Sequence, residues 1–496
     1  MNKKYILSID AGTTSSRAII FDKNANIINI AQYEFNQFFP KEGWVEHDAI
    51  EIWNTQLKAI NDVIKDSRIK ADEIDSIGIT NQRETTVIWD KQTGKPVYNA
   101  IVWQDRRTAK FCDELKENNK TELIQNKTGL VIDAYFSGTK IKWVLDNNLG
   151  LRSRALNNEL LFGTIDTWLI WNLTKGKSHI TDTSNASRTL LYNVKDDNWD
   201  QELLDLFKIP RNILPSVVDS SSVSAYVDES IVGSKIPISG IAGDQQAALF
   251  GQLCIEEGDI KNTYGTGCFC MMNTGSNFVK SKNKMLSTIA WRINGKLTYA
   301  LEGSVFVAGA LIQWLRDKLG IIKSSPEVEQ LANTVSDNGG LTFIPALSGL
   351  AAPYWDPYVQ GTIFGITRGT ENGHIARAAL ESIALRTRDI IVEMEKDAGI
   401  QFTNLKVDGG ASNNNLLMQI QANLLNTSVI RPKTTETTAL GVAFLAGLAT
   451  GFWKDIESLK ALWVREKSFK PDEKFNSIEI INLWQDRIQK LLKINE

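Results

Sequence analysis

Short apolar runs separated by polar turns recur along the chain, and they are interspersed with apolar residues at helical spacing. Residues 6–9, apolar except for Ser8, and residues 18–21 flank a polar turn, and residues 74–80 and 85–90 again flank a polar turn. Residues 99–103 predict a further strand. Residues 375–398 carry apolar side chains three to four positions apart, which predicts an amphipathic helix. Strands alternating with helices predict an α/β architecture.

The first predicted hairpin has a turn suited to an anionic ligand. Asp10 ends the first strand, and Gly12 lets the backbone approach whatever lies in the turn. Hydroxyl residues fill positions 13–16, and Arg17 adds a fixed positive charge. Backbone N–H groups, a cation and a carboxylate suit a polyphosphate with Mg²⁺. Taken alone, an ordinary β-hairpin with a polar turn explains the pattern equally well.

A second hairpin of the same kind lies near the middle of the chain. Residues 258–272 again form an apolar strand, a turn of Gly and Thr, and another strand. The repetition predicts two similar halves that face each other across a cleft. We place the boundary near residues 250–258, where Gly251 and Gly258 flank a short segment. The predicted domains are residues 1–250 and 251–496.

Two predicted junctions between a strand and a helix carry further candidate chemistry. Residues 405–408 form a strand that runs into Gly409 and Gly410, with a helix beginning near Leu416. Such a joint brings a ligand close to a helix N-terminus, although Asn capping of the helix explains it as well. Asp244 follows the strand at 236–243 and is either an N-cap or a general base held at a strand end.

Composition narrows the class of protein. A chain of 496 residues is too long for one core, so two large domains are expected. The net charge of −3 and the pI near 5.9 disfavour nucleic acid and anionic membrane as partners. The most apolar run, residues 438–453, is shorter than the roughly 20 residues of a membrane span and predicts a buried helix.

Cysteine usage and the first residues of the chain bear on the compartment. Four cysteines in a chain of this length do not form a disulfide framework. Cys268 and Cys270 have no histidine near them, so we expect buried small side chains rather than a zinc site. The first apolar run is too short and too β-patterned for a signal peptide. A cytoplasmic location is therefore expected.

Several catalytic motifs are absent from the sequence. There is no GxxxxGK[ST], no HRD or DFG, no GxGxxG after the first strand, and neither HExxH nor GxSxG. These absences argue against P-loop enzymes, protein kinases, dinucleotide-binding enzymes, zinc proteases and serine hydrolases.

The two hairpins, the Gly409-Gly410 joint and Asp244, in this order, resemble the sugar-kinase, heat-shock-protein and actin superfamily. Within it, residues 135–147 and 361–381 resemble the two signatures of the FGGY carbohydrate kinases. The resemblance implies two ribonuclease-H-like, actin-like ATPase domains with mixed sheets flanked by helices and an active site in the interdomain cleft. It also implies ATP and Mg²⁺ as cofactors and a homo-oligomer, either dimer or tetramer.

The substrate-side phrases, residues 82–86, 103–107, 182–189 and 243–246, resemble the branch of this family that phosphorylates glycerol. The residues implied to bind the three hydroxyls are Arg83, Glu84, Tyr135, Asp244 and Gln245. Trp103 and Phe269 are implied to cover the carbon backbone, and Asp244 to act as general base. The expected product is sn-glycerol 3-phosphate. The alternatives are a kinase of another polyol or pentulose and a catalytically silent ATP-binding regulator.

The resemblance also implies a nucleotide site. The residues implied at the phosphates are Thr13, Thr14, Ser15, Arg17 and Thr266. Those implied around the rest of the nucleotide are Gly309, Gln313, Gly410 and Asn414, and Asp10 matches the acid that holds Mg²⁺ through water. One departure is the loop at residues 225–233, which lacks the histidine that some relatives phosphorylate, so that form of control is not expected.

Overall fold

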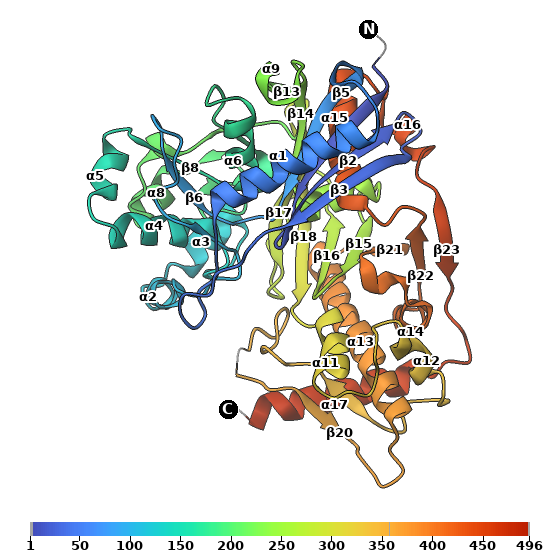
Figure 1. Cartoon of the computed structure of the whole chain (residues 1–496). Helices are drawn as coiled ribbons and strands as arrows, with labels where there is room; N and C mark the ends of the chain where they lie inside the picture. The colour runs from blue at the N-terminus through green and yellow to red at the C-terminus, as the bar shows by residue number, and fades with distance from the viewer. Residues whose placement is uncertain (1–2, 357, 495–496) are drawn as a thin grey trace.

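A computed structural model describes residues 3–356 and 358–494 of the chain. The central element of the fold is one mixed sheet of 13 strands that runs through both halves of the molecule (Figure 1). From the N-terminal edge the order is β3 (Ile27–Glu34), β2 (Ser15–Asp22), β1 (Tyr5–Ala11), β5 (Ile74–Asn81), β14 (Pro237–Gly243), β13 (Ser221–Tyr226), β17 (Leu286–Ile293), β18 (Lys296–Val305), β16 (Cys268–Asn273), β15 (Ile260–Tyr264), β21 (Asn404–Asp408), β22 (Ser428–Pro432) and β23 (Arg465–Phe469).

The sheet has one weak joint, between β13 and β17. We call residues up to 250 the N-terminal half and the later residues the C-terminal half. Strands β13 and β17 are joined by a single pairing, Ser221 with Ile293. In each half, one hairpin lies beside a parallel strand: β1–β2 beside β5, and β15–β16 beside β21. The predicted α/β class and the repeated hairpin are therefore confirmed.

Helices cover the sheet and build two lobes beside it (Figure 1). The N-terminal half carries α1 (Ala49–Asp66), α2 (Ala109–Glu117), α3 (Thr121–Thr128), α4 (Ser137–Asn147), α5 (Leu151–Leu156), α6 (Ile165–Leu173), α8 (Gln201–Phe207) and α10 (Asp244–Gly251). The C-terminal half carries α11 (Gly309–Asp317), α12 (Glu327–Ala332), α13 (Asn372–Ala398), α14 (Asn415–Leu425), α15 (Thr437–Thr450) and α17 (Ser477–Ile494).

Helix α15 connects the two halves. It lies on β5 and β14 so closely that a Cβ on Gly78 would meet the Val442 carbonyl oxygen at 2.3 Å. It also crosses α10, where a Cβ on Gly441 would lie 1.8 Å from the Ala247 oxygen. The prediction of a buried helix over this apolar run is confirmed. Among the described residues, every helix is too short or too polar to traverse a bilayer.

Two local predictions need adjustment. The strand predicted at residues 99–103 is limited to β7 (Ala100–Ile101). Beyond it, Val102 N still donates to Val45 O, beside β4 (Glu46–His47), but Trp103 N donates to the Thr85 hydroxyl and not to a strand backbone. The long helix starts at Asn372, earlier than expected. All four cysteines are free and buried, as predicted for Cys268 and Cys270.

Candidate active site

The turn between β1 and β2 presents a mixture of engaged and free groups. Gly12 N donates to Ser15 O at 2.9 Å and closes the turn. The Thr13 hydroxyl accepts from Trp103 Nε1 at 3.0 Å, and the buried Ser15 hydroxyl accepts from Gln32 Nε2 at 3.0 Å. Thr14 is exposed at the tip. The turn can therefore present backbone amides and one free hydroxyl to a ligand.

The charged groups behind this turn pair with each other. Arg17 donates to Asp10 across the hairpin and to Glu436 Oε2 at 2.7 Å, just before α15. Asp10 is buried, whereas the side chains of Arg17 and Glu436 keep about a quarter and a third of their exposure, at 25% and 31%. Asp10, and to a lesser extent Glu436, raise the pKa of Arg17, so the guanidinium stays charged.

The turn between β15 and β16 is held by the start of α11. Gly309 N donates to Gly265 O at 3.0 Å, and Ala308 N donates to Thr266 O at 2.9 Å. A Cβ on Gly309 would meet the Gly265 oxygen at 2.6 Å, so this contact requires glycine. Thr266 itself is exposed, and its side chain is free to contact a ligand.

The predicted nucleotide residues beyond this turn lie on three elements. Gly410 begins a 3-10 turn, and a Cβ there would meet nothing within 4 Å. Asn414 caps α14, its side chain accepting from Leu417 N at 2.8 Å, so the capping alternative describes its contact in this structure. Glu329 also accepts from two N-terminal amides of α14, which leaves that helix end poorly suited to phosphate. Gln313 lies exposed on α11.

Arg83 is the centre of the predicted substrate site. It is 2% exposed and lies in the turn that follows β5. Its Nε is 3.0 Å from Asp244 Oδ1, its Nη2 is 3.4 Å from the Tyr135 hydroxyl, and Nη1 donates to Gln246 at 3.2 Å. Both Nη atoms also donate to Glu302 of β18. The sequence expectation that Arg83, Tyr135 and Asp244 lie together is therefore matched by the geometry.

Glu84 is held in an unusual conformation beside this arginine. Its φ is 61°, a value that costs a non-glycine residue free energy and often marks a functional position. Its carbonyl accepts from Ser137 Oγ at 2.9 Å, and its carboxylate accepts from Arg188 Nε at 2.6 Å. Burial raises the pKa of Glu84, with Arg188 and Arg83 opposing the rise.

Asp244 occupies the first position of α10, with Gly243 rather than Asp244 at the N-cap. Its side chain is 33% exposed. Burial raises the pKa of the carboxyl, while Arg83 and Lys261 oppose the rise. The neighbouring Gln245 accepts from Lys261 Nζ at 2.6 Å. Asp244 is thus a partly accessible carboxylate in contact with Arg83, which suits a proton acceptor.

Aromatic rings form one wall of this region. The ring of Trp103 lies 5.6 Å from that of Tyr135 and 6.5 Å from that of Phe269, edge to face in both cases. Phe269 comes from β16, so the wall contains side chains of both halves. Aromatic surfaces of this kind cover the CH groups of a ligand whose hydroxyls are bound by polar residues.

Three residues of the site were not among the predicted ones: Arg188, Lys261 and Glu302. Arg188 and Glu302 are buried and bond to each other at 2.9 Å. Although burial would raise the pKa of Glu302, Arg188 and Arg83 lower it to about 2. Lys261 is the single charge of β15, and Glu302 is the single charge in the buried part of β18, whose other charge, Lys296, is exposed at the start of the strand. A charge in such a run is the signal that could have revealed them, because buried charges need partners.

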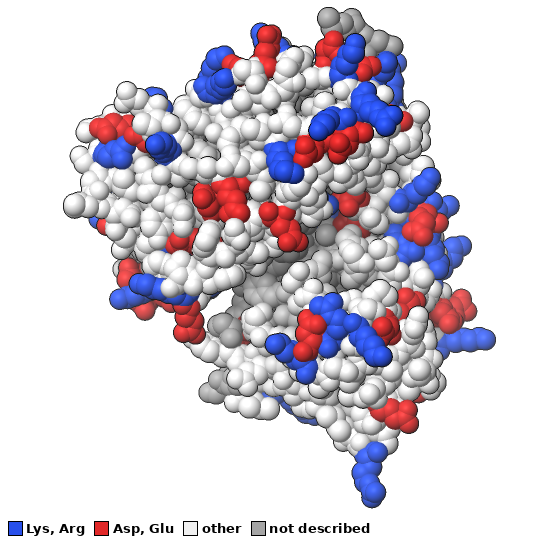
Figure 2. Space-filling model, viewed as in Figure 1, with Lys and Arg blue, Asp and Glu red and all other residues white. Residues whose placement is uncertain are grey.

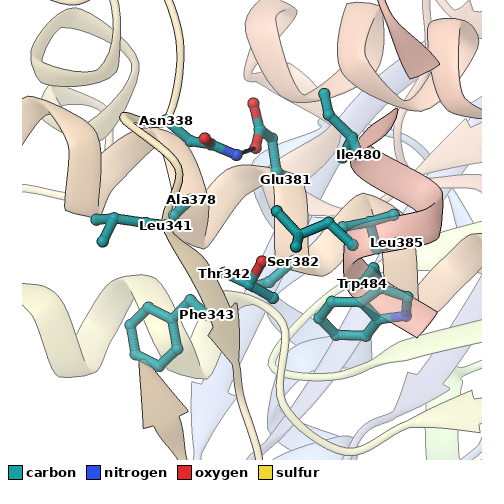
Figure 3. A pocket seen from close by; sticks show the side chains of 11 residues that line it. Asn338, Leu341, Thr342, Phe343, Ala378, Glu381, Ser382, Leu385, Ile480 and Trp484 are labelled. Carbon is teal, nitrogen blue, oxygen red and sulfur yellow. Dashed lines mark hydrogen bonds between the residues drawn. The ribbon is translucent and has the colours of Figure 1, made fainter. Parts of the chain in front are cut away.

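A hollow separates the upper and lower parts of the molecule on the face shown in Figure 2. Two cavities lie outside the predicted set of site residues. One of about 10 Å³ lies between α13 and α17, where Asn338 donates to Glu381 at 2.6 Å (Figure 3). Another of about 440 Å³ lies beside Trp199 and Arg292. Neither includes a predicted site residue, so neither competes with the site around Arg83.

The fold and the site define a two-domain phosphotransferase of the actin-like ATPase class. Residues 5–251 match the N-terminal domain, and residues 260–450 the C-terminal domain, of the FGGY family of carbohydrate kinases. The chain belongs to this family.

Similar proteins cover nearly the whole chain. Glycerol kinase 2 of Thermotoga maritima is 57% identical over 490 residues, with 99% of each chain covered. The glycerol kinase of Borreliella burgdorferi is 58% identical over 489 residues, with 98% of each covered. The structure of Plasmodium falciparum glycerol kinase with ADP superimposes with a TM-score of 0.93 at 37% identity, covering 99% of both chains.

Proposed function

We propose that this chain transfers the γ-phosphoryl group of ATP to a terminal hydroxyl of glycerol, giving sn-glycerol 3-phosphate and ADP. The observation that carries the proposal is the cluster of Arg83, Tyr135 and Asp244 beside an aromatic wall. The similarity to curated glycerol kinases over almost the full chain supports it. A guanidinium, a phenol hydroxyl and a carboxylate together offer both donors and acceptors to adjacent hydroxyls.

In the proposed site the polar residues bind the hydroxyls and the rings cover the carbons. Arg83, Glu84, Tyr135, Asp244 and Gln245 bind the hydroxyls, and Trp103 and Phe269 cover the carbon backbone. Asp244 accepts the proton of the attacking glycerol hydroxyl while the oxygen of that hydroxyl bonds to the γ-phosphorus. The bond from that phosphorus to the bridging oxygen of ADP breaks in line. Positioning and electrostatic stabilisation supply most of the acceleration in such a transfer.

On the nucleotide side, both hairpin turns face the phosphates in this proposal. Thr13, Thr14, Ser15, Arg17 and Thr266 contact the phosphates. Gly309, Gln313, Gly410 and Asn414 surround the rest of the nucleotide. The adenine end lies near Gly410, because Glu329 already occupies the nearby helix N-terminus and repels phosphate.

Mg²⁺ fits this site as a companion of the nucleotide. Among the described residues no cluster of three His, Cys, Asp or Glu side chains is placed to hold a metal. A buried Asp10 alone is the donor set expected for Mg²⁺ that takes its other ligands from phosphates and water. When bound, the ion would neutralise charge on the phosphates.

Three wider features belong to the same proposal. The domain boundary lies at residues 250–251, near the loop between α10 and β15, and domain closure excludes water from the reaction. The protein is a dimer or tetramer. It acts in the cytoplasm, for which the free thiol state of all four cysteines gives support.

An acceptor panel tests the proposed activity. ADP release is measured with ATP, Mg²⁺ and glycerol, erythritol, a pentulose or gluconate as acceptor. We expect the highest kcat/KM with glycerol. Strong turnover of a pentulose beside weak turnover of glycerol would assign the chain to another branch of the family, and no turnover with any acceptor would favour the silent regulator.

The variant Asp244→Asn tests the proposed base. Loss of a general base is expected to lower kcat by roughly 10²- to 10⁴-fold. Asp200→Asn is the matched control, because Asp200 also begins a helix but serves there as the N-cap of α8. Since Asn caps as well as Asp, this control should keep normal kcat. Near-normal turnover of Asp244→Asn would mean that another group takes the proton.

A further inference from the structure

Four buried charged side chains form a row of ion pairs, alternating in sign, next to the predicted polyol site. Glu302 accepts from Arg83 Nη2 at 3.1 Å and from Arg188 Nη2 at 2.9 Å, both at its Oε1. Arg188 in turn donates from Nε to Glu84 Oε1 at 2.6 Å. Each of these four residues is at most 2% exposed. The order Arg83, Glu302, Arg188, Glu84 therefore places each charge beside one of opposite sign.

This row of four charges crosses between the two halves of the molecule. Arg83, Glu84 and Arg188 belong to the N-terminal half, whereas Glu302 lies on β18 of the C-terminal half. The two predicted hydroxyl ligands, Arg83 and Glu84, are consecutive in sequence but are oriented by different partners. Arg83 is held by Glu302 directly, and Glu84 is held by Glu302 only through Arg188.

Arg188 also lies close to two aromatic rings and keeps one donor without a partner. Arg188 Nη1 is buried and has no hydrogen-bond partner within the described residues. The Arg188 guanidinium lies 5.5 Å from the Tyr135 ring centroid and 5.2 Å from that of Phe136. A pair that served stability alone would gain nothing from an unsatisfied donor. The arrangement instead fixes the side chains on which the polyol would rest.

We propose that Glu302 and Arg188 are positioning residues for the acceptor: the carboxylate of the C-terminal half fixes Arg83 and, through Arg188, Glu84. The inference rests on the proposed function, because it assigns Arg83 and Glu84 to the acceptor. It predicts that disturbing these four residues affects the acceptor site and leaves the nucleotide site intact, since within the described residues no side-chain hydrogen bond or ion pair joins any of the four to a predicted nucleotide ligand.

The variant Glu302→Gln keeps the shape of the side chain and removes its charge. We expect KM for glycerol to rise roughly 10- to 100-fold, the effect of losing a hydrogen bond to a charged group. KM for ATP should stay within about threefold of the wild type, well below the change expected for glycerol. Glu302→Asp keeps the charge but shortens the side chain, so it should recover part of the loss. It also replaces Glu302→Gln in the test if that variant does not fold.

A double variant tests the coupling between the two residues. If Glu302 orients Glu84 through Arg188, the double variant Glu302→Gln/Arg188→Gln should lose less than the product of the two single losses, as coupled neighbours do. Independent roles would give the full product and would overturn the proposal.

Asp389→Asn is the control for a general loss of stability. Asp389 is also a buried carboxylate, bonded to Arg386, Tyr354 and Trp484 in the C-terminal half. It should lower the melting temperature without changing KM for glycerol. If Glu302→Gln behaves the same way, or raises both KM values equally, Glu302 is structural and the inference is wrong. Failure of the proposed function is visible separately, because the wild type would then not phosphorylate glycerol; the same comparison is made with whichever acceptor it does use.

Discussion

At the residue scale, the protonation of Asp244 depends on opposing influences. Burial raises the pKa of its carboxyl, while Arg83 and Lys261 act in the other direction. A general base works only when deprotonated, so kcat should fall as the pH drops through this raised pKa. Lys261 therefore extends the active range toward acid, although it also binds Gln245.

The variant Lys261→Met removes one of these two cations. The pKa of Asp244 should then rise further, and the acidic limb of the kcat–pH profile should move to higher pH. Lys406→Met is the matched control, because Lys406 pairs with Lys261 across β15 and β21 but donates to the carbonyls of Gln252 and Leu253. Steady-state kinetics between pH 5 and 9 measure the shift. An unmoved limb in Lys261→Met would mean that the limb does not report Asp244.

His47 gives a prediction about stability. It is fully buried against Phe35, both of its ring nitrogens lack a hydrogen-bond partner among the described residues, and burial lowers its pKa to about 4. The unfolded chain, with a histidine pKa near 6.5, binds more protons than the folded chain between about pH 6.5 and pH 4. The free energy of unfolding therefore rises with pH in this window, and it falls as the pH drops because protonation of this histidine favours the unfolded chain.

The variant His47→Leu removes this titration without breaking a hydrogen bond. From pH 7.5 to pH 5, the free energy of unfolding should fall by about 2 kcal/mol less in the variant than in the wild type. Urea unfolding at both pH values measures the difference. An equal fall in both proteins would show that His47 is not neutral in the folded state or not buried in solution.

At the element scale, local pattern was a good guide to strands and turns but not to their partners. Both glycine- and threonine-containing hairpins and the strand before Asp244 are where the sequence predicts them. Glu302 was missed because its partner Arg83 lies 219 positions away and the strand around it carries no motif. The limit of the strand at 99–103 has a similar cause, since the backbone donor of Trp103 goes to the side-chain hydroxyl of Thr85 and not to a neighbouring strand.

The crossing of α10 and α15 predicts a sensitive glycine. A Cβ on Gly441 would lie 1.8 Å from the Ala247 oxygen, so Gly441→Ala must push the two helices apart. Overpacking of this kind costs roughly 1–3 kcal/mol of stability. Because α10 begins at Asp244, kcat should also fall, by up to about 100-fold for a displacement near 1 Å.

Thermal unfolding and saturating kinetics measure the two effects of Gly441→Ala. Gly369→Ala is the control, because the nearest atom to a Cβ there is 3.9 Å away. It should change neither stability nor kcat. Normal stability of Gly441→Ala would show that the two helices can separate without cost.

At the scale of the whole molecule, the two halves are joined by more than the segment that links them in sequence. One core cluster combines Ile6 and Phe21 from the first hairpin with Phe444 and Trp453 near the other end of the chain. The sequence indicates that residues 438–453 are buried, but it does not indicate against what, because burial is a local property and the covering strands are more than 190 positions away. Helix α15 consequently brings Glu436, at its N-terminal end, to the first hairpin.

The contact between Glu436 and Arg17 leads to a prediction about nucleotide binding. Arg17 is proposed to bind phosphate, yet in this structure its Nη1 donates to Glu436 at 2.7 Å. An incoming phosphate therefore competes for Arg17 with a carboxylate of the same charge sign. Glu436→Gln keeps the shape and removes this competition, so KM for ATP should fall roughly two- to fivefold, as expected for a partly exposed ion pair. The gain should shrink as salt is added, because both side chains are accessible to screening ions.

Initial rates against ATP concentration, at low and high salt, measure this effect. Glu159→Gln is the control, because Glu159 also forms a partly exposed pair, with Arg154 at 3.1 Å, on the lobe of the N-terminal half. It should leave KM for ATP unchanged at either salt concentration. A rise in KM for Glu436→Gln would have the opposite meaning: Glu436 would then hold Arg17 in the orientation that phosphate requires, and the link between the two ends of the chain would assist nucleotide binding rather than compete with it.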